Sequence, residues 1–283
     1  MTGGTESWFS EKLHPAFQQR FTVGEVLHRS HTGLQDLLVF DNPFFGRILA
    51  LDGVVQTTER DEFCYHEMIA HVPILAHGAV RDVLIVGGGD GGTLRDVLRH
   101  GSVERATMVE IDGKVVDLCR QYLPGLSAGA FDDPRTELVI GDGLKYVRET
   151  DRRFDLIVVD STDPIGPATP LFSDEFYADC RDLLTDDGIV VCQSGVGFVQ
   201  PEEAAGTLAR MQRLFADPAL YLAQVPTYAF GFMTLGWGAK SARARATDAA
   251  TIRARFDAAG IETRYYTPEI HAACFALPAY MRS

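Results

Sequence analysis

The stretch VLIVGGGDGG, residues 83–92, decides the fold. Its first four residues predict a β-strand buried on both faces, and its glycines predict a tight turn into a helix. Similar apolar runs alternate with helical segments as far as residue 215, which predicts a parallel sheet covered on both faces. We therefore expect an α/β domain with a Rossmann-like doubly wound sheet. The expected strands are 82–86, 106–111, 137–140, 156–159 and 189–192, then 221–226 and 232–239; the expected helices are 93–100, 113–123, 143–150, 173–184, 201–215 and 248–259.

Residues 1–75 show a different pattern, with short strand-like runs separated by turn residues. Asp52-Gly53 predicts a two-residue hairpin turn. A helix is expected over 60–76, ending near Pro73, with a solvated acidic start at 60–62. The sequence thus predicts a small N-terminal β-strand domain (1–75) before the α/β domain (76–283). The remaining expected strands are 21–30, 34–40, 45–51 and 54–57.

The composition of the chain limits the classes of partner. It has 283 residues, with 39 acidic and 26 basic side chains and a net charge of −13. Nucleic acids and anionic membranes require basic surface, so neither is an expected partner. There is no signal-like start and no apolar run of the ~20 residues that a membrane span needs. The five cysteines are scattered, which indicates reduced thiols, and we therefore expect a cytoplasmic protein. The histidines have no ligand-like spacing, so no metal site is expected.

Carboxylates follow the first four strands of the predicted sheet. Asp90, Glu110, Asp142 and Asp160 stand at the strand ends, and Asp163 follows three residues later. One such aspartate alone is as often a helix cap as a ligand. In a sheet of this kind, however, ligands bind beyond the carboxyl ends of the strands. Because clustered carboxylates repel one another unless they share a cation, the pattern predicts a positively charged ligand.

The glycine run narrows the ligand further. Residues 87–92 match G-x-G-x-x-G, and Glu110 lies at the usual distance for an acid that binds ribose hydroxyls. A dinucleotide pyrophosphate beside Asp90 would be repelled, by about 1 kcal/mol in water and about 4 kcal/mol at an effective dielectric near 20 for charges ~4 Å apart. A nucleoside with a cationic arm would instead be attracted to Asp90. Decarboxylated S-adenosylmethionine fits better than S-adenosylmethionine, whose arm also carries a carboxylate.

Four long segments resemble the polyamine aminopropyltransferases, most of all the bacterial spermidine synthases: LDGVVQTTERDEFCYHEMIAHVP (51–73), VLIVGGGDGGTLRDVLRH (83–100), DSTDPIGPA (160–168) and RYYTPEIHAACFALP (264–278). The resemblance implies a Rossmann-like catalytic domain similar to that of S-adenosylmethionine-dependent methyltransferases. It implies a homodimer or homotetramer. It also implies transfer of aminopropyl from decarboxylated S-adenosylmethionine to putrescine, giving spermidine and 5′-methylthioadenosine, with no prosthetic group.

The same resemblance implies roles for single residues. Asp160 would be the catalytic base, and Asp90 would bind the aminopropyl amine. The nucleoside would be held by Gln35, Glu110, Asp142 and Gly143, with Pro167 lining the adenine pocket. The diamine would be bound by Tyr65, His66, Asp160, Ser161, Thr162, Asp163 and Tyr228. The Pro- and Gly-rich loop 161–172 is expected to close over both substrates.

Some alternatives remain open at this point. Without the YHE context, His66 would be assigned to the surface, and Tyr65 and Tyr228 to the core. Ala229-Phe230-Gly231 departs from the usual family sequence after Tyr228, so spermidine, agmatine or cadaverine stay open as acceptors. An amine N-methyltransferase would use S-adenosylmethionine instead. A non-catalytic polyamine or nucleoside sensor would be expected to lack the acid at position 160.

Overall fold

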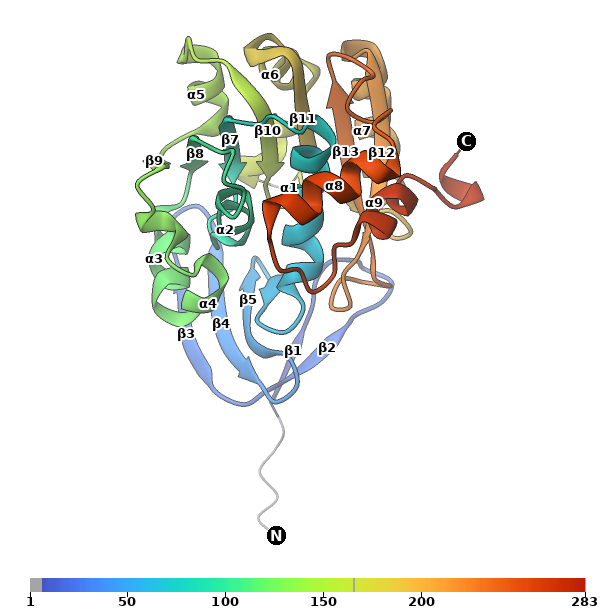
Figure 1. The fold of residues 1–283 in the computed structure, drawn as a ribbon. Helices are drawn as coiled ribbons and strands as arrows, with labels where there is room; N and C mark the ends of the chain where they lie inside the picture. The colour runs from blue at the N-terminus through green and yellow to red at the C-terminus, as the bar shows by residue number, and fades with distance from the viewer. Residues whose placement is uncertain (1–6, 165, 283) are drawn as a thin grey trace.

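The N-terminal domain is built of two small antiparallel sheets. A computed structural model describes residues 7–164 and 166–282, and Figure 1 shows this domain below the α/β domain. Strands β1 and β2 form a two-stranded sheet, and β3 to β6 form a four-stranded one in chain order. Their bounds are β1 Ser7–Ser10, β2 Arg20–Val23, β3 Val26–His31, β4 Asp36–Asn42, β5 Gly46–Leu51 and β6 Val54–Thr58.

The predicted hairpin between β5 and β6 is confirmed. Leu51 pairs with Val54, and Asp52 and Gly53 both have positive φ, 49° and 83°, as a type I′ turn requires. The single strand predicted over 21–30 is wrong, because the chain breaks at Gly24 into β2 and β3. The Gly24 N–H donates to the Asp41 carbonyl at 2.8 Å, outside the β3–β4 ladder.

The second domain contains one seven-stranded sheet, in the order β12-β13-β11-β10-β7-β8-β9. The five strands from β11 to β9 in this order run parallel, and β13 pairs antiparallel with both β11 and β12. The predicted doubly wound α/β sheet is therefore confirmed, with an antiparallel hairpin added at one edge (Figure 1). The strands are β7 Asp82–Gly87, β8 Arg105–Glu110, β9 Thr136–Ile140, β10 Phe154–Asp160, β11 Leu184–Val196, β12 Asp217–Gln224 and β13 Phe232–Ala239.

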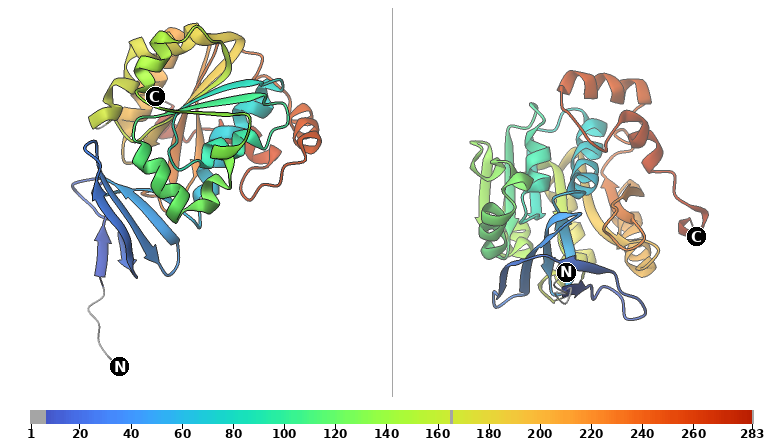
Figure 2. Two further views of the ribbon diagram at one scale, coloured as in Figure 1. Left: turned by 90° about the vertical axis from the view of Figure 1, so that its left-hand side faces the viewer. Right: turned by 90° about the horizontal axis from the view of Figure 1, so that it is seen from below.

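Alternate residues of β7 belong to separate apolar cores on the two faces of the sheet. Val83 and Ile85 pack into one core, and Leu84 and Val86 into the other. Helices α1 and α2 cover the first face, with α8 packed against α1, and α5, α6 and α7 cover the second, so the sheet is buried between two helical layers (Figure 2). The helices are α1 Glu62–His77, α2 Gly92–Leu98, α3 Gly113–Tyr122, α4 Pro124–Ser127, α5 Gly143–Glu149, α6 Asp174–Leu183, α7 Pro201–Leu214, α8 Ala249–Ala259 and α9 Pro268–Cys274.

Helix α1 does not end near Pro73, as the sequence had suggested, but continues to His77. Proline in a helix removes one backbone hydrogen bond. Here Pro73 and most of its neighbours along the helix are buried, so tertiary packing outweighs that loss. Gly78 then ends the helix in a left-handed conformation, donating its N–H to Ile74. The domain boundary predicted after residue 75 falls within α1 and stays a prediction.

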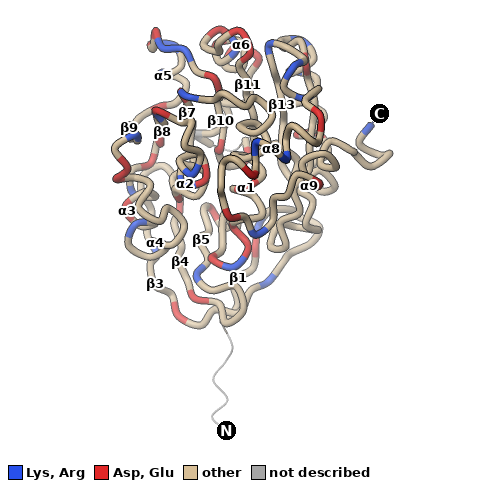
Figure 3. Tube along the Cα trace, viewed as in Figure 1, with Lys and Arg blue, Asp and Glu red and all other residues tan. Residues whose placement is uncertain are grey.

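Charged residues of both signs are distributed over the two domains (Figure 3). Within the described ranges, no helix combines the length and the hydropathy that crossing a membrane requires.

Candidate active site

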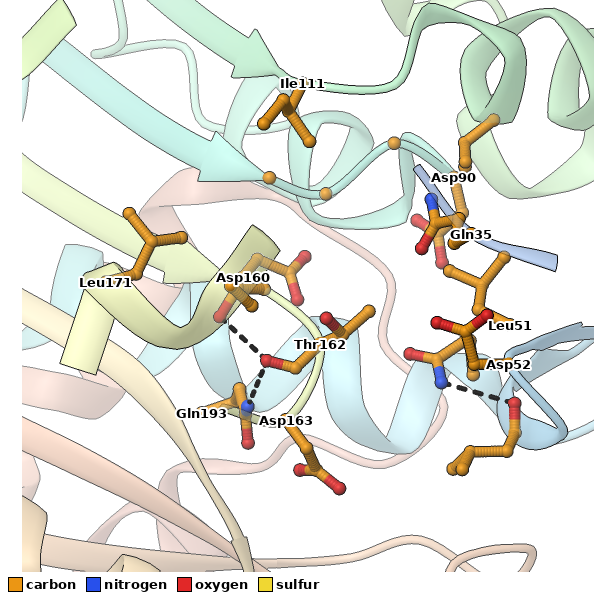
Figure 4. A pocket seen from close by; sticks show the side chains of 18 of the residues that line it. Gln35, Leu51, Asp52, Asp90, Ile111, Asp160, Thr162, Asp163, Leu171 and Gln193 are labelled. Atoms are coloured by element: carbon orange, nitrogen blue, oxygen red, sulfur yellow. Dashed lines mark hydrogen bonds between the residues drawn. The ribbon is translucent and has the colours of Figure 1, made fainter. Parts of the chain in front are cut away.

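A cavity of about 400 Å³ lies at the carboxyl end of the sheet, walled by both domains. Figure 4 shows acidic and amide side chains converging on it from separate elements. The side chain of Pro167 lies outside what the structure describes. Every other residue predicted for the site lines this cavity: Gln35, Tyr65, His66, Asp90, Glu110, Asp142, Gly143, Asp160, Ser161, Thr162, Asp163 and Tyr228.

The glycine turn after β7 packs directly on the end of β10. Gly87 has a φ of 88°, and a Cβ there would lie 2.2 Å from the main-chain oxygen of Asp160. The next N–H, of Gly88, donates to that same oxygen at 2.7 Å. Gly92 packs equally closely on the His66 ring, where a Cβ would lie 2.3 Å from it. Glycine is therefore required at Gly87 by both conformation and space, and at Gly92 by space alone.

Asp160 is held by two hydroxyl donors at the end of β10. The Tyr65 hydroxyl donates to Oδ1 at 2.7 Å, and the Thr93 hydroxyl donates to Oδ2 at 2.6 Å. Burial raises the pKa of Asp160, and the nearby charge of Asp90 raises it further. The neighbouring acid that raises this pKa is Asp90, from the glycine turn, and not Asp163 three residues along the chain. A carboxylate with two donors keeps free lone pairs and can still accept a proton.

His66 is buried in the wall of the cavity, not on the surface of α1. Its Nδ1 lies 2.7 Å from Glu62 Oε2, and its Nε2 lies 3.3 Å from Asp90 Oδ2. Burial alone would lower the pKa of His66, but Asp90 and Glu62 outweigh it and raise that pKa well above its usual value. The start of α1 is likewise not solvated, because Asp61 and Glu62 are both buried. The sequence could not show Arg95 of α2 reaching across to Glu62.

Glu110 and Gln35 are joined by Asp112, which the sequence had not singled out. The Asp112 N–H donates to Glu110 Oε1 at 2.8 Å, and Gln35 Nε2 donates to Asp112 Oδ2 at 3.0 Å. Thr32 donates to the same oxygen at 2.7 Å, so this aspartate ties the β3–β4 turn to the end of β8. Burial raises the pKa of Glu110 to about 7. Asp112 also caps α3, which was its only visible signal in the sequence.

Asp142 and Gly143 line the cavity and also stabilise the start of α5. Asp142 Oδ1 accepts from the Leu144 N–H at 2.9 Å and so caps α5. A Cβ at Gly143 would lie 2.4 Å from a Val86 methyl group, so the Val86 side chain of β7 packs directly on the backbone at the start of α5. The capping interpretation of a strand-end aspartate is therefore confirmed for Asp142, which also lines the cavity; its role as a ligand stays a prediction.

The other end of the cavity is lined by amides as well as acids. Asp163 Oδ2 accepts from Gln200 at 2.9 Å. Gln193 donates to the Thr162 carbonyl at 3.0 Å (Figure 4). The Ser161 hydroxyl donates to the same carbonyl. Sequence reasoning missed both glutamines, because nothing in the local pattern marks a glutamine as functional.

Tyr228 closes this end of the cavity from the C-terminal part of the chain. Its hydroxyl donates to the Gln56 carbonyl of β6 at 2.7 Å. Its ring meets that of Tyr65 edge to face, with centroids 6.3 Å apart. The two tyrosines are thus partly core aromatics, as the sequence allowed, and also form part of the cavity wall.

Seven carboxylates line the cavity, and among its described lining residues there is neither lysine nor arginine. The only basic lining residue in that set is His66. The site can therefore accommodate cationic groups at both ends. Within the described residues, no group of three or more His, Cys, Asp or Glu is arranged to hold a metal ion; the absence of a metal stays a prediction. The seven are Glu11, Asp52, Asp90, Glu110, Asp142, Asp160 and Asp163.

Two family models match the chain. The spermine/spermidine synthase domain matches residues 62–248, and the spermidine synthase tetramerisation domain matches residues 7–59. The chain belongs to the spermine/spermidine synthase family. Relatives in this family include a polyamine aminopropyltransferase from Ruegeria sp. (strain TM1040), 56% identical over 98% of both chains. Polyamine aminopropyltransferase 1 of Pseudomonas aeruginosa is 55% identical over 96% of both.

Solved structures of the family share the whole architecture. A spermidine synthase in complex with the transition state analogue AdoDATO has a TM-score of 0.94 and 38% identity, covering 99% of this chain and 94% of its own. Spermidine synthase from Thermotoga maritima has a TM-score of 0.90 and 36% identity with the same coverage. The chain is therefore an aminopropyltransferase of the spermine/spermidine synthase family.

Proposed function

We propose that this enzyme transfers the aminopropyl group of decarboxylated S-adenosylmethionine to putrescine, giving spermidine and 5′-methylthioadenosine. The observation that carries the proposal is the acidic cavity, in which a buried aspartate held by two hydroxyls stands between an acidic nucleoside end and an acidic acceptor end. The spermidine synthase that binds AdoDATO, with the same fold over 99% of this chain, supports it.

The donor lies, in this proposal, along the β7–β8–β9 side of the cavity. Glu110 accepts hydrogen bonds from the ribose hydroxyls, and Gln35 binds beside it. Asp142 and Gly143, with Pro167, hold the adenine. Asp90 pairs with the amine of the aminopropyl arm, which carries no carboxylate to be repelled.

The acceptor lies at the other end. Asp163 pairs with the remote ammonium of putrescine, and Tyr65, His66 and Tyr228 shape the channel for the attacking amine. Ser161 and Thr162 line it beside Asp160. The loop 161–172 closes over both substrates and excludes water.

Asp160 accepts a proton from the attacking ammonium, which frees a nitrogen lone pair. That lone pair attacks the arm carbon bonded to sulfur, the C–S bond breaks, and its electron pair leaves on the sulfur as a neutral thioether. No acid is needed for this leaving group, so orientation and one proton acceptor suffice. The raised pKa of Asp160 brings it closer to that of the ammonium.

Turnover of each donor with each acceptor tests the proposal. Decarboxylated S-adenosylmethionine with putrescine is expected to give spermidine at the highest kcat/KM. Faster turnover of spermidine, agmatine or cadaverine would replace the acceptor but keep the reaction. Methylation of putrescine by S-adenosylmethionine would contradict the proposed role of Asp90.

We also propose that the enzyme assembles as a homodimer or homotetramer. The match of residues 7–59 to a tetramerisation domain supports this, as do apolar side chains exposed there, including Trp8 and Phe44. Light scattering after gel filtration measures the mass directly; a monomer at micromolar concentration would contradict the proposal.

Replacing Asp112 with alanine is expected to raise the KM for the donor about tenfold and to change kcat less. The variant removes the carboxylate that accepts from both Gln35 and Thr32, a loss of about 1–2 kcal/mol of positioning. The backbone N–H at position 112 remains and still donates to Glu110. Steady-state kinetics with each substrate varied in turn provide the measurement. Asp132→Ala, which removes an exposed ion pair with Arg120, is the matched control. Equal changes in the two KM values would contradict the assignment.

A further inference from the structure

The wall of the cavity behind Asp90 contains a row of charged side chains, Arg95, Glu62 and His66, whose charges have no part in the reaction as described above. Resting on the proposed function, we infer that Glu62 is a positioning residue that holds His66 as an imidazolium against Asp90. This fixed cation keeps Asp160 ionised as the proton acceptor. Glu62 touches neither substrate; it acts through His66.

The geometry of the imidazole defines its charge. Carboxylate oxygens face both ring nitrogens, Glu62 at Nδ1 and Asp90 at Nε2. A neutral ring has one nitrogen with a lone pair, which would point at a carboxylate. Only the doubly protonated ring presents an N–H to both carboxylates. A ring in this state has no lone pair left, so His66 cannot itself be the base.

Glu62 is fixed in turn by Arg95 from the neighbouring helix. Arg95 Nη1 and Nη2 donate to the two Glu62 oxygens at 3.2 and 3.0 Å. The same guanidinium bonds to the fully buried Asp96 and to the Leu126 carbonyl. Glu62 and His66 are one turn apart on α1, so the ion pair lies along the helix. The close approach of Gly92 prevents the ring from turning away.

The His66 imidazolium acts on Asp160, and several other groups around Asp160 also influence its ionisation. Tyr65 of α1 and Thr93 of α2 donate to Asp160, and the negative charge of Asp90 opposes its ionisation. Glu110 of β8 and Tyr228 also face it across the cavity. Within this set, His66 lowers the pKa of Asp160 and offsets part of the effect of Asp90. Without that positive charge, Asp160 would retain its proton to a higher pH.

Glu62→Gln removes the negative charge next to His66 while keeping the size and shape of the side chain. A glutamine oxygen can still accept from His66 Nδ1, and Arg95 keeps its contacts with Asp96 and Leu126. The ring loses one of its two counter-charges and becomes neutral near neutral pH. The acid limb of the pH profile then moves toward higher pH, because the base must be ionised to act.

The test compares kcat/KM for the acceptor, at saturating donor, against pH for the wild type, Glu62→Gln, His66→Gln and the double variant. Each single variant is expected to shift the acid limb upward by about one pH unit, a roughly tenfold lower rate at a given acidic pH. The double variant is expected to shift no further than His66→Gln alone. The ionisation of the diamine affects all four proteins equally, so it does not contribute to the differences between their pH profiles. Independent, additive shifts, or none, would overturn the inference.

A measurement without turnover separates this inference from the proposed function. In nitrogen-15 spectra of the histidine side chains, the signal that His66→Gln removes identifies residue 66. It is expected to stay that of an imidazolium to pH 8 in the wild type, and to titrate below pH 8 in Glu62→Gln. A neutral ring in the wild type overturns the inference even if spermidine is made. An imidazolium in a protein that makes no spermidine leaves the row of charges intact and contradicts the function.

Discussion

An Asp160→Asn variant is expected to lose about a thousandfold in kcat while remaining folded. General-base assistance contributes on the order of 10²–10⁴ in rate, and an amide cannot accept the ammonium proton. Asparagine has nearly the same shape, and its carbonyl oxygen can still accept from Tyr65 at the position of Oδ1. Single-turnover kinetics with both substrates saturating measure the loss.

The matched control for this variant is Asp163→Asn, which lies in the same loop and contacts Gln200. It is expected to raise the KM for putrescine while lowering kcat much less, because it removes a binding charge. Thermal unfolding and donor binding by both variants check that the fold and the nucleoside end are intact. A near wild-type kcat for Asp160→Asn would exclude Asp160 as the base.

Replacing Gly87 with alanine is expected to lower the free energy of unfolding by at least about 3 kcal/mol and to abolish most activity. The new Cβ would lie 2.2 Å from the Asp160 carbonyl oxygen and 2.9 Å from its carbon, both main-chain atoms that cannot turn aside. The positive φ of Gly87 adds about 1 kcal/mol or more of backbone strain. Urea denaturation and steady-state kinetics measure the two effects.

Gly101→Ala is the control for that substitution, because a Cβ there meets nothing within 4 Å and its φ is not positive. It is expected to change stability by less than about 1 kcal/mol and to leave kcat unaltered. If Gly87→Ala were as mild as this control, the close packing of β7 on the end of β10 would be contradicted.

The sheet was predictable because its strands are continuous apolar runs with a period that helices do not share. The four residues from Val83 to Val86 alternate between two cores, as expected for a strand that is covered by helices on both faces. Pro73 misled the sequence interpretation because a local rule was outweighed by tertiary burial. The break between β2 and β3 at Gly24 was missed because such a break depends on the neighbouring strand, not on the sequence around it.

The candidate site was predictable where chemistry coincides with strand ends, and not where it depends on contacts distant in sequence. Asp90, Glu110 and Asp160 were visible because parallel strands bring their carboxyl ends to one edge. Asp112, Gln193 and Gln200 were missed because each acts through a partner far away in the sequence. The positive charge of His66 was missed for the same reason, since it depends on Arg95 by way of Glu62.

The hydrogen bond from Tyr228 to the Gln56 carbonyl spans 172 residues of sequence. Closing so long a loop is entropically costly until most of the intervening structure exists, so we expect this contact to form late in folding. The wall between the two domains is then expected to be among the last parts of the molecule to assemble. A nascent or partly unfolded chain has strand ends but no closed cavity. If the proposed donor is the substrate, its sulfonium is thus held only by a chain whose folding is complete.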